Sequence, residues 1–384
     1  MYLIGIDVGG THTKFGLIND GKLVKTLKVS TNTFDVIRQV VNGVRELAQS
    51  AGCNFEDIEG VAVGFPGMVI DNVVKDSPNI GLQNCNIVEL LTQELDGKTV
   101  IAMNDAELAV LAEHRMGAGL NCDNMVLITI GTGVGGGVIV DKQLYVGKGG
   151  AGELGHIVLE SNGLQCKCGR KGCAEQYISL TALDRMTREL ASGYPDTQVI
   201  IPNDSKVDAS DLVKAYKRND GLAIAVINKY VKLLKDYILN ICNLLRPDKV
   251  VIGGGLCHAP EIIDMVAKAC KAENFGFANS PSVDIVMAEL GNEAGILGAV
   301  VCFEGVERAP KIDLNKVNDM LSTSHEIDQD VEPFVYSQEG LLINSNNILD
   351  NMYESSKENV NNSDNENVAY DEDMLNRLND KLKR

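Results

Sequence analysis

Hydrophobic and polar positions along the chain alternate between the two-residue period of β-strands and the longer period of amphipathic helices. Repeated through most of the sequence, this alternation is typical of an α/β protein. Strands are predicted over 2–7, 13–18, 23–29, 61–65, 100–103, 125–130, 138–141 and 249–252. Helices are predicted over 34–51, 105–116, 181–190, 221–245, 261–273 and 293–302.

Glycine-rich turns follow two of the predicted strands, and they indicate an internal repeat. Segments 6–11 and 130–136 each run from an apolar strand into glycine and threonine, and then into a second strand. We expect two similar lobes that place both turns beside one cleft. Segment 131–136 also matches the G-x-G-x-x-G pattern of dinucleotide sites. That site needs a helix after the turn, whereas 138–140 continues as a strand, so the dinucleotide interpretation is disfavoured.

The same glycine turns are candidate phosphate sites. Without Cβ atoms, successive backbone N–H groups can converge on an anion. Thr11, Thr13 and Thr132 would add hydroxyl donors, and Asp7, at a strand end, would hold a hydrated Mg²⁺. The alternative is that these are ordinary hairpin glycines, which is the better interpretation for any one turn taken alone. A third glycine cluster at 253–255 favours phosphate binding.

Three cysteines and a histidine have the spacing of a metal site. The candidate ligands are His156, Cys166, Cys168 and Cys173. Thiolates and imidazole suit Zn²⁺, and four protein ligands leave no position for a catalytic water. A disulfide is the alternative, but it would leave one cysteine over. We expect a structural zinc that fixes the loop between Glu153 and Glu175.

An acidic residue follows the predicted strand 100–103, where the helix over 105–116 begins. Asn104 or Asp105 could cap this helix, with Glu107 completing a capping box at Asn104. Alternatively, because ligands bind beyond the carboxyl ends of strands in α/β sheets, Asp105 could accept a hydroxyl proton and orient that oxygen for attack on a γ-phosphate. The local sequence leaves both roles open.

Composition narrows the classes of function. The chain has 384 residues, enough for two domains, of which 45% are apolar and 23% are charged. Its net charge of −18 argues against a general nucleic-acid binder or a protein of anionic membranes, since both need clustered Lys and Arg. Neither a membrane span nor a signal peptide is expected. Seven cysteines scattered singly through apolar segments are typical of reduced core thiols, which predicts a cytoplasmic protein.

The composition changes towards the C-terminal end. Segment 306–384 is polar and asparagine-rich, and its 17 acidic and 8 basic side chains supply half of the net charge. It holds too few apolar residues to offset the entropy of ordering, so we predict an acidic, largely disordered tail. The tail is either a dispensable solvated segment or a segment that binds a partner.

Together these segments resemble the ROK family of sugar kinases and repressors, and most of all its glucokinases. The matching motifs, in the order of the family, are DVGGTHTK (7–14), GFPG (64–67), PN (78–79), ND (104–105), GTGVGGG (131–137), GELGH (152–156), the cysteine motif (166–175) and GGG (253–255). The cysteine motif and its upstream Glu-x-Gly-His are the most specific. Two features depart from the family: the tail is extra, and the N-terminal winged helix of the repressors is lacking, so DNA binding is not expected.

The resemblance implies a two-lobed, actin-like (RNase H-like) ATPase fold of the α/β class with a central cleft. A small α/β lobe would span 1–118, with 290–305 returning to it. A large α/β lobe would span 119–289 and carry the zinc loop 156–175.

The resemblance also assigns site residues. Asp105 would be the general base, and His156 would serve both the sugar and the zinc. Sugar hydroxyls would be held by Gly67, Asn79, Asn104, Asp105, Glu153, His156 and Glu175. ATP and Mg²⁺ would be bound on the side formed by Asp7, Gly9, Gly10, Thr11, Thr13, Lys14, Thr132, Gly133 and Gly254.

We therefore predict an ATP-dependent hexose kinase of the glucokinase type, which phosphorylates the 6-hydroxyl of its sugar. The alternatives are a kinase for another hexose (N-acetylmannosamine, N-acetylglucosamine, allose or fructose) and a non-catalytic sugar sensor. The expected partners are a small-molecule sugar and, in a homodimer, a second copy of the chain.

Overall fold

The computed structural model describes residues 2–77, 79–273 and 281–303, and the backbone of two short strands beyond them. Contacts divide the chain into two compact units, Met1–Lys311 and Ile312–Arg384. In the second unit, β14 (Phe334–Tyr336) pairs antiparallel with β15 (Leu342–Asn344). Apart from these strands, the predicted acidic tail lies outside the described residues.

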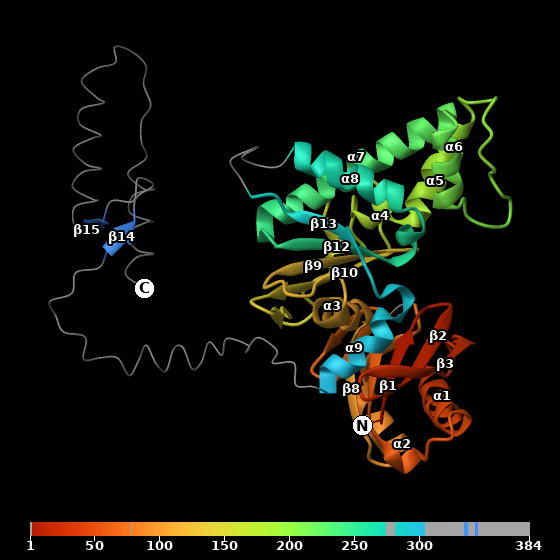
Figure 1. Ribbon diagram of the computed structural model, residues 1–384, viewed down its shortest axis with the longest axis vertical. Helices are drawn as coiled ribbons and strands as arrows, with labels where there is room; N and C mark the ends of the chain where they lie inside the picture. The colour runs from red at the N-terminus through yellow and green to blue at the C-terminus, as the bar shows by residue number, and fades with distance from the viewer. Residues whose placement is uncertain (1, 78, 274–280, 304–333, 337–341, 345–384) are drawn as a thin grey trace, which may run out of the picture. The chain divides into compact units, whose positions relative to one another are not determined.

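A five-stranded sheet in the order β3-β2-β1-β4-β8 forms the first lobe of the first unit (Figure 1). Its strands are β1 (Tyr2–Val8), β2 (His12–Asn19), β3 (Lys22–Ser30), β4 (Ile58–Phe65) and β8 (Thr99–Asn104). The first three pair antiparallel, and β4 and β8 join in parallel. Asp20 and Gly21 between β2 and β3 both have positive φ, as a two-residue type I′ hairpin requires.

Helix α1 (Val36–Ser50) confirms the predicted helix over 34–51. The Asp35 side chain caps it by accepting a hydrogen bond from the backbone N–H of Arg38 (3.3 Å). Val40, Val44 and Leu47 have no exposed surface and join the core of the first sheet. The apolar stripe therefore fixes which face of α1 meets the sheet.

The second lobe repeats this topology with the sheet order β11-β10-β9-β12-β13. Its strands are β9 (Met125–Ile130), β10 (Val134–Val140), β11 (Gln143–Leu144), β12 (Lys249–Gly253) and β13 (Asp284–Met287). Again three strands pair antiparallel and the last two join in parallel. The β9–β10 hairpin thus corresponds to the β1–β2 hairpin, and the predicted internal repeat is confirmed.

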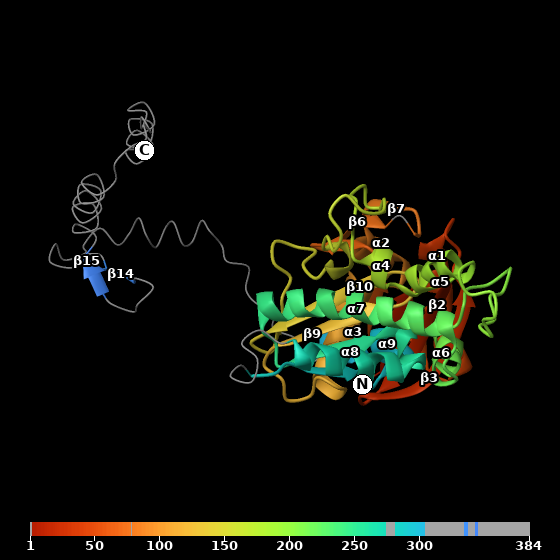
Figure 2. The same cartoon turned by 90° about the horizontal axis from the view of Figure 1, so that it is seen from above.

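Helices cover the second sheet on the face away from the first lobe. α7 (Gly221–Leu245) and α8 (Pro260–Ala272) lie side by side there (Figure 2). The others are α4 (Glu175–Ile178), α5 (Leu180–Ala191) and α6 (Ala209–Lys217). Tyr230 of α7 is fully buried, and its hydroxyl donates to the carbonyl of Ile178 (2.5 Å). This contact ties α4, at the end of the cysteine-rich loop, to the core of the lobe.

Two helices, α3 (Asp105–Met116) and α9 (Ala294–Phe303), lie between the two sheets and pack against each other (Figure 1). Gly5 of β1 and Gly137 of β10 permit the close approach, since a Cβ at either position would overlap the helix packed on it. Because α3 contacts both lobes, it is enclosed on several sides, and even Glu107 and Glu113 are buried. α3 is thus a shared wall of both lobes.

A small antiparallel sheet extends from the end of β4 and was absent from the sequence-based prediction. Its strands are β5 (Met68–Ile70), β6 (Val73–Ser77) and β7 (Leu82–Asn86), and α2 (Ile87–Glu94) follows it. Gly67, with φ +99°, starts the sheet at a point where a Cβ would overlap the carbonyl of Asp76. A glycine is required there, which explains the end of the GFPG motif.

Candidate active site

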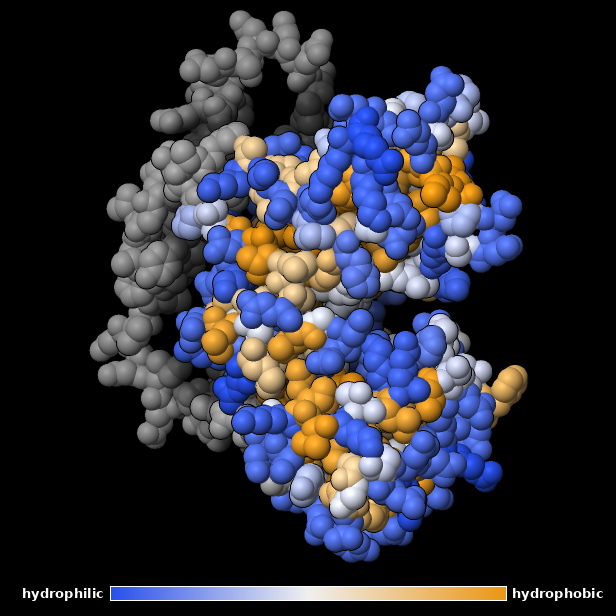
Figure 3. Space-filling view, turned by 45° about the vertical axis from the view of Figure 1, so that its right-hand side comes forward, coloured by the Kyte–Doolittle hydropathy of each residue, from blue (hydrophilic) through white to orange (hydrophobic). Residues whose placement is uncertain are grey.

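The cleft between the lobes holds two neighbouring pockets, and both lobes line each of them. The space-filling view shows the hollow between the lobes (Figure 3). Helix α3 begins between the pockets: Asn104, its N-cap, lines the first pocket, and Asp105, its first residue, lines the second. A group passed between ligands in the two pockets would therefore pass the start of α3.

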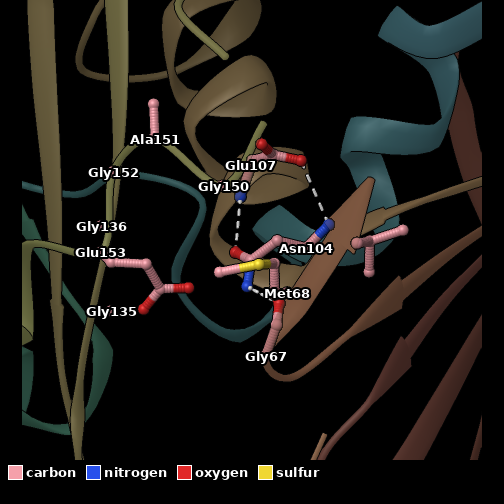
Figure 4. Close-up of a pocket in the computed structure, with 11 residues that line it drawn as sticks. Gly67, Met68, Asn104, Glu107, Gly135, Gly136, Gly150, Ala151, Gly152 and Glu153 are labelled. Atoms are coloured by element: carbon pink, nitrogen blue, oxygen red, sulfur yellow. Dashed lines mark hydrogen bonds between the residues drawn. The ribbon is translucent and has the colours of Figure 1, made fainter. Parts of the chain in front are cut away.

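Asn104 is held in the wall of the first pocket by its role as the helix cap (Figure 4). Its Oδ1 accepts hydrogen bonds from the backbone N–H groups of Ala106 (2.8 Å) and Glu107 (3.3 Å). The Glu107 carboxylate accepts from the backbone N–H of Asn104 (3.2 Å), so the capping box that the sequence left open as one alternative is present. Asn104 Nδ2 donates to the carbonyl of Gly67 (2.8 Å), which fixes the amide between α3 and β5.

Glu153 stands on the opposite side of the first pocket, on the second lobe (Figure 4). Burial raises the pKa of its carboxyl; nearby His156 opposes this shift and Glu175 adds to it. Glu175 lies behind it, and its Oε2 accepts from the backbone N–H of Val134 (3.1 Å). The first pocket therefore offers carboxylate and amide groups that suit the hydroxyls of a polar ligand.

Met68 crosses the first pocket and meets the second lobe. A Cβ on Gly150 would lie 3.2 Å from Met68 Cε, and Ile70 faces Gly149 in the same way at 2.9 Å. Gly149 and Gly150 have φ of +109° and +71°, a backbone that glycine adopts without strain. The pocket has a free volume of about 20 Å³, room for roughly one water molecule. This free volume is smaller than a hexose, and Met68 is one of the side chains that limit it.

The second pocket combines charged side chains of the first lobe with the glycine turn that follows β12. Lys14 Nζ lies 3.1 Å from the Asp7 carboxylate and donates to the carbonyl of Asn292 (3.4 Å). Thr129 and Gly254 line the pocket from the second lobe. Gly254 has φ +80° and packs so closely on Ile130 that no side chain would fit. Such a site has both the bare backbone and the charges that a phosphate–metal complex needs.

Asp105 faces this second pocket and is half-buried in its wall. One carboxylate oxygen accepts from the backbone N–H of Ala106 (2.8 Å), while the helix cap is Asn104. Burial, and after it the charge of Asp7, raises the pKa of Asp105 to about 7, although the Ala106 N–H opposes the shift. A carboxylate with such a pKa can exchange a proton near neutral pH, as a general base must.

The predicted phosphate-binding residues lie at different distances from the second pocket. Asp7, Lys14 and Gly254 line it. Gly10, Thr11 and Thr132 are exposed on their turns, and Gly133 packs against the Glu175 carboxylate. These four and Gly9 are not among the lining residues.

Thr13 lies inside the first lobe and not at the pocket surface. It is fully buried, and its hydroxyl is 3.1 Å from the hydroxyl of Thr31. Thr31 in turn donates to the carbonyl of Gly9 (2.6 Å). The buried pair therefore supports the turn between β1 and β2, so the expected direct hydroxyl donor at position 13 is not seen.

The predicted sugar residues also divide into two groups. Gly67, Asn104 and Glu153 line the first pocket, whereas Glu175 lies behind it. Asn79 is exposed and lies beside the turn between β1 and β2. A Cβ placed on Gly10 of this turn would be 3.6 Å from the Cβ of Asn79.

The cysteine-rich loop brings the four predicted metal ligands together. The ligand atoms of His156, Cys166, Cys168 and Cys173 all lie within 4.8 Å of one another. Cys166 Sγ is 3.7 Å from His156 Nδ1, and Cys168 Sγ is 3.6 Å from Cys173 Sγ. Two sulfurs on one tetrahedral Zn²⁺ would be about 3.8 Å apart, given Zn–S bonds of about 2.3 Å. The donor set therefore fits zinc, and all ten cysteines are free of disulfides.

Two details connect the metal cluster with the first pocket. His156 turns Nδ1 towards Cys166, while its Nε2 lies 4.0 Å from the Glu153 carboxylate. Burial, and then the hydrogen bonds that the Cys173 thiol donates to Cys168 and Cys166, raises the pKa of Cys173 to about 12. A cation must therefore displace a proton there, and once bound it would fix the imidazole beside Glu153.

Among the pocket-lining residues that the sequence analysis did not propose are Met68, Thr129, Glu113 and Asn292. Met68 and Thr129 had a usable signal, since each lies next to or just before a glycine motif. Glu113 and Asn292 had none, because only the packing of α3 and α9 between the lobes brings them to the pocket.

Two lobes of one topology, with a cleft between them and an acid between two pockets, define a protein of the actin-like ATPase fold. Residues 3–305 match the ROK family, and the chain belongs to that family. It is 34% identical over 310 residues to a glucokinase of Thermotoga maritima, covering 77% of this chain and 95% of the relative. It is 26% identical over 307 residues to an N-acetylmannosamine kinase of Haemophilus influenzae, covering 78% and 94%.

A solved structure supports the same assignment. A ROK family glucokinase from Streptomyces griseus in complex with glucose and AMPPNP matches with a TM-score of 0.70 and 29% identity, over 79% of this chain and all of that chain. The chain is thus a sugar kinase of the ROK family. Among the described residues, every helix is too short or too polar to span a bilayer.

Proposed function

We propose that this chain is an ATP-dependent glucokinase that transfers the γ-phosphoryl group to the 6-hydroxyl of glucose. The observation that carries the proposal is the place of Asp105 at the start of α3, between a pocket with hydroxyl-binding groups and a pocket with phosphate-binding groups. The glucose and AMPPNP of the Streptomyces griseus relative support a sugar in the first pocket and a nucleotide in the second.

The first pocket would orient the sugar through its hydroxyls. Asn104 is preorganised for this, because its Oδ1 and one Nδ2 hydrogen are already engaged and the second hydrogen remains to donate. Glu153 would accept from hydroxyls on the opposite side. The full set of proposed sugar ligands is Gly67, Asn79, Asn104, Asp105, Glu153, His156 and Glu175.

Asp105 would act as the general base. Its carboxylate takes the proton of the 6-hydroxyl as that oxygen forms a bond to the γ-phosphorus, and the bond to the bridging β–γ oxygen breaks, so that ADP leaves. Lys14 and the glycine turns would stabilise charge on the phosphate oxygens. Mg²⁺, for which Asp7 is the proposed ligand, supplies further charge neutralisation when bound.

Zinc would have a structural role. Four protein ligands would leave no open coordination position on the zinc. The zinc would therefore only fix the loop that carries Glu153 and His156. The proposed ligands are His156, Cys166, Cys168 and Cys173.

A kinase for N-acetylmannosamine is the second candidate, because a relative of that name covers as much of the chain as the glucokinase does, 78% against 77%, although its identity is lower. The test is ADP release with Mg-ATP and a panel of glucose, N-acetylmannosamine, N-acetylglucosamine, allose and fructose. We expect the highest kcat/KM for glucose. A preference for an N-acetylated sugar would overturn the choice of glucose, and the absence of ADP release with every sugar would indicate a non-catalytic sugar sensor.

Replacement of the proposed base tests the mechanism. In Asp105→Asn the amide cannot accept the proton, so we expect turnover to fall by about 10²- to 10⁴-fold, the usual share of general base catalysis. Glucose binding, measured by calorimetry, should persist, since the other sugar ligands are untouched. Near-normal turnover would contradict the role of Asp105.

A homodimer and a cytoplasmic location stay predictions. Sedimentation of the purified chain tests the first, and fractionation of cells tests the second.

A further inference from the structure

Two chain segments connect the lobes, and one buried carboxylate joins them. The first connection, 117–124, runs from α3 to β9, and the second, 288–293, runs from β13 to α9. Glu113 has no exposed surface. Its Oε2 accepts from the backbone N–H groups of Ala118 (2.9 Å) and Glu289 (3.2 Å), and its Oε1 accepts from that of Leu290 (2.8 Å).

The second connection also builds the second pocket. Asn292, two residues beyond Leu290, lines this pocket, and its carbonyl accepts from Lys14 Nζ (3.4 Å). Gly295 at the start of α9 packs on Asp7, where a Cβ would be 3.4 Å from the carboxyl carbon. The hydrogen bonds of Glu113 therefore hold the segment whose Asn292 and Gly295 contact Lys14 and Asp7 of the proposed nucleotide site.

The geometry leaves Glu113 little freedom. A buried carboxylate is tolerated when N–H donors satisfy it, and hydrogen bonds to a charged group are stronger than neutral ones. Gly117 makes room for it, since a Cβ there would overlap the carboxylate. Eight residues separate Glu113 from Asp105 on the same rigid helix. A rotation of the lobes that moves the second connection away from α3 must break the hydrogen bonds from Glu289 and Leu290.

We propose that Glu113 is a positioning residue that clasps the two connections between the lobes, and that it thereby holds the nucleotide pocket in shape relative to Asp105. This inference rests on the proposed kinase function for its kinetic consequences. Its consequence for nucleotide binding does not depend on which sugar is phosphorylated.

The test is Glu113→Gln, which keeps the shape of the side chain but turns one acceptor into a donor that faces backbone N–H groups. We expect the Kd for AMPPNP, measured by calorimetry, to rise about 10-fold, which corresponds to about 1.4 kcal/mol. In the sugar assay we expect a similar rise in KM for Mg-ATP and a lower kcat, while KM for glucose changes less than about 2-fold, since the first pocket is untouched.

A matched control separates this role from a loss of stability. Asp220 caps α7 in the second lobe, and its carboxylate also accepts from two backbone N–H groups, those of Gln198 (2.7 Å) and Ala223 (3.0 Å). It lies outside both pockets. Asp220→Asn should lower the melting temperature, as Glu113→Gln does, without changing the Kd for AMPPNP or either KM.

A second variant covers the case in which Glu113→Gln does not fold. Gly117→Ala keeps the Glu113 carboxylate, but the added methyl group pushes it away from its N–H donors. This variant should also raise the Kd for AMPPNP. Wild-type Kd and kinetic constants in a folded Glu113→Gln or Gly117→Ala protein would overturn the proposal. If the wild-type protein fails to phosphorylate glucose, the proposed function fails, whereas the AMPPNP comparison still decides the role of Glu113.

Discussion

At the scale of single residues, the carboxyl of Asp105 has a pKa of about 7 because it is buried and because Asp7 faces it. The charges of Asp7 and Glu153 raise the pKa of Asp105, and Lys14 lines the same pocket. A protonated carboxyl cannot take a proton from a hydroxyl. Asp105 can therefore act as a base only in the upper part of the neutral pH range.

This gives a pH prediction with a defined sign. The pKa of Asp105 is raised from its usual value near 4. We therefore expect the logarithm of kcat/KM to rise with pH, with a slope of one, up to pH about 7 and then to level off. Asp7→Asn removes a neighbouring negative charge, so it should lower the pKa of Asp105 and move the rising limb to lower pH. It should also weaken the binding of Mg-ATP. Profiles of kcat/KM from about pH 5 to about pH 9, around the pH range in which most proteins are stable, measure the pKa in the wild type and in the variant. A wild-type profile that stays flat over this range, as it would for a carboxyl with an ordinary pKa, would contradict the raised pKa.

At the scale of elements, the loop over 147–152 contacts β5 across the first pocket. A Cβ on Gly150 would meet Met68, and φ at Gly150 is +71°. We expect Gly150→Ala to raise KM for the sugar by about 10-fold through crowding and backbone strain of about 1–2 kcal/mol. The Kd for AMPPNP should not change, because no residue of this loop lines the second pocket.

Gly97 provides the control for backbone strain. It has φ +79°, close to that of Gly150, but a Cβ there would meet nothing within 4 Å. Gly97→Ala should lose a similar amount of stability and keep the wild-type KM. Equal effects of the two substitutions on KM would show that strain, and not the contact with Met68, is responsible.

The cysteine-rich loop is the second element with a testable role. We expect about one zinc per chain by metal analysis, and its loss in Cys168→Ser, because a hydroxyl is a poor substitute for a thiolate ligand. The melting temperature should fall and KM for the sugar should rise, since His156 and Glu153 lose their support. Cys85, in β7, is not one of the four candidate ligands, so Cys85→Ser serves as the control that keeps its zinc. A fully active, metal-free protein would refute the structural zinc.

Features of the fold that depend on residues close together in the chain could be predicted from the sequence. The apolar stripe of α1, the Asp20-Gly21 turn and the capping box at Asn104 each depend on residues at most a few positions apart. The cysteine motif likewise gave all four members of the metal cluster. These features could be predicted because near neighbours in the chain decide them.

Features held by distant contacts could not be predicted in this way. The strands β5 to β7 are short: β5 has three apolar residues, and β6 and β7 carry charged and amide side chains, so no two-residue period marks them. Thr13 has the pattern of a hydroxyl donor, but packing of β3 on β2 buries it against Thr31. Glu113 is one acid on a predicted helix, and its partners are more than 170 residues away except for Ala118.

At the scale of the whole molecule, charge opposes the proposed nucleotide substrate. The chain carries −18, and the second pocket holds three acids, Asp7, Asp105 and Glu113, against Lys14. An anionic nucleotide therefore approaches a protein of its own sign, and bound Mg²⁺ reduces this repulsion only in part. Glucose is neutral and should not be affected.

Salt should therefore act on the two substrates differently. Raising the ionic strength from about 0.01 M to about 0.15 M shortens the Debye length from about 30 Å to about 8 Å, which screens the repulsion. We expect kcat/KM for Mg-ATP to rise several-fold over this range while kcat/KM for glucose stays constant, both measured at saturating concentrations of the other substrate. A fall with salt would mean that local positive groups such as Lys14 attract the nucleotide more strongly than the acids around it repel it, and the electrostatic account of the cleft would be wrong.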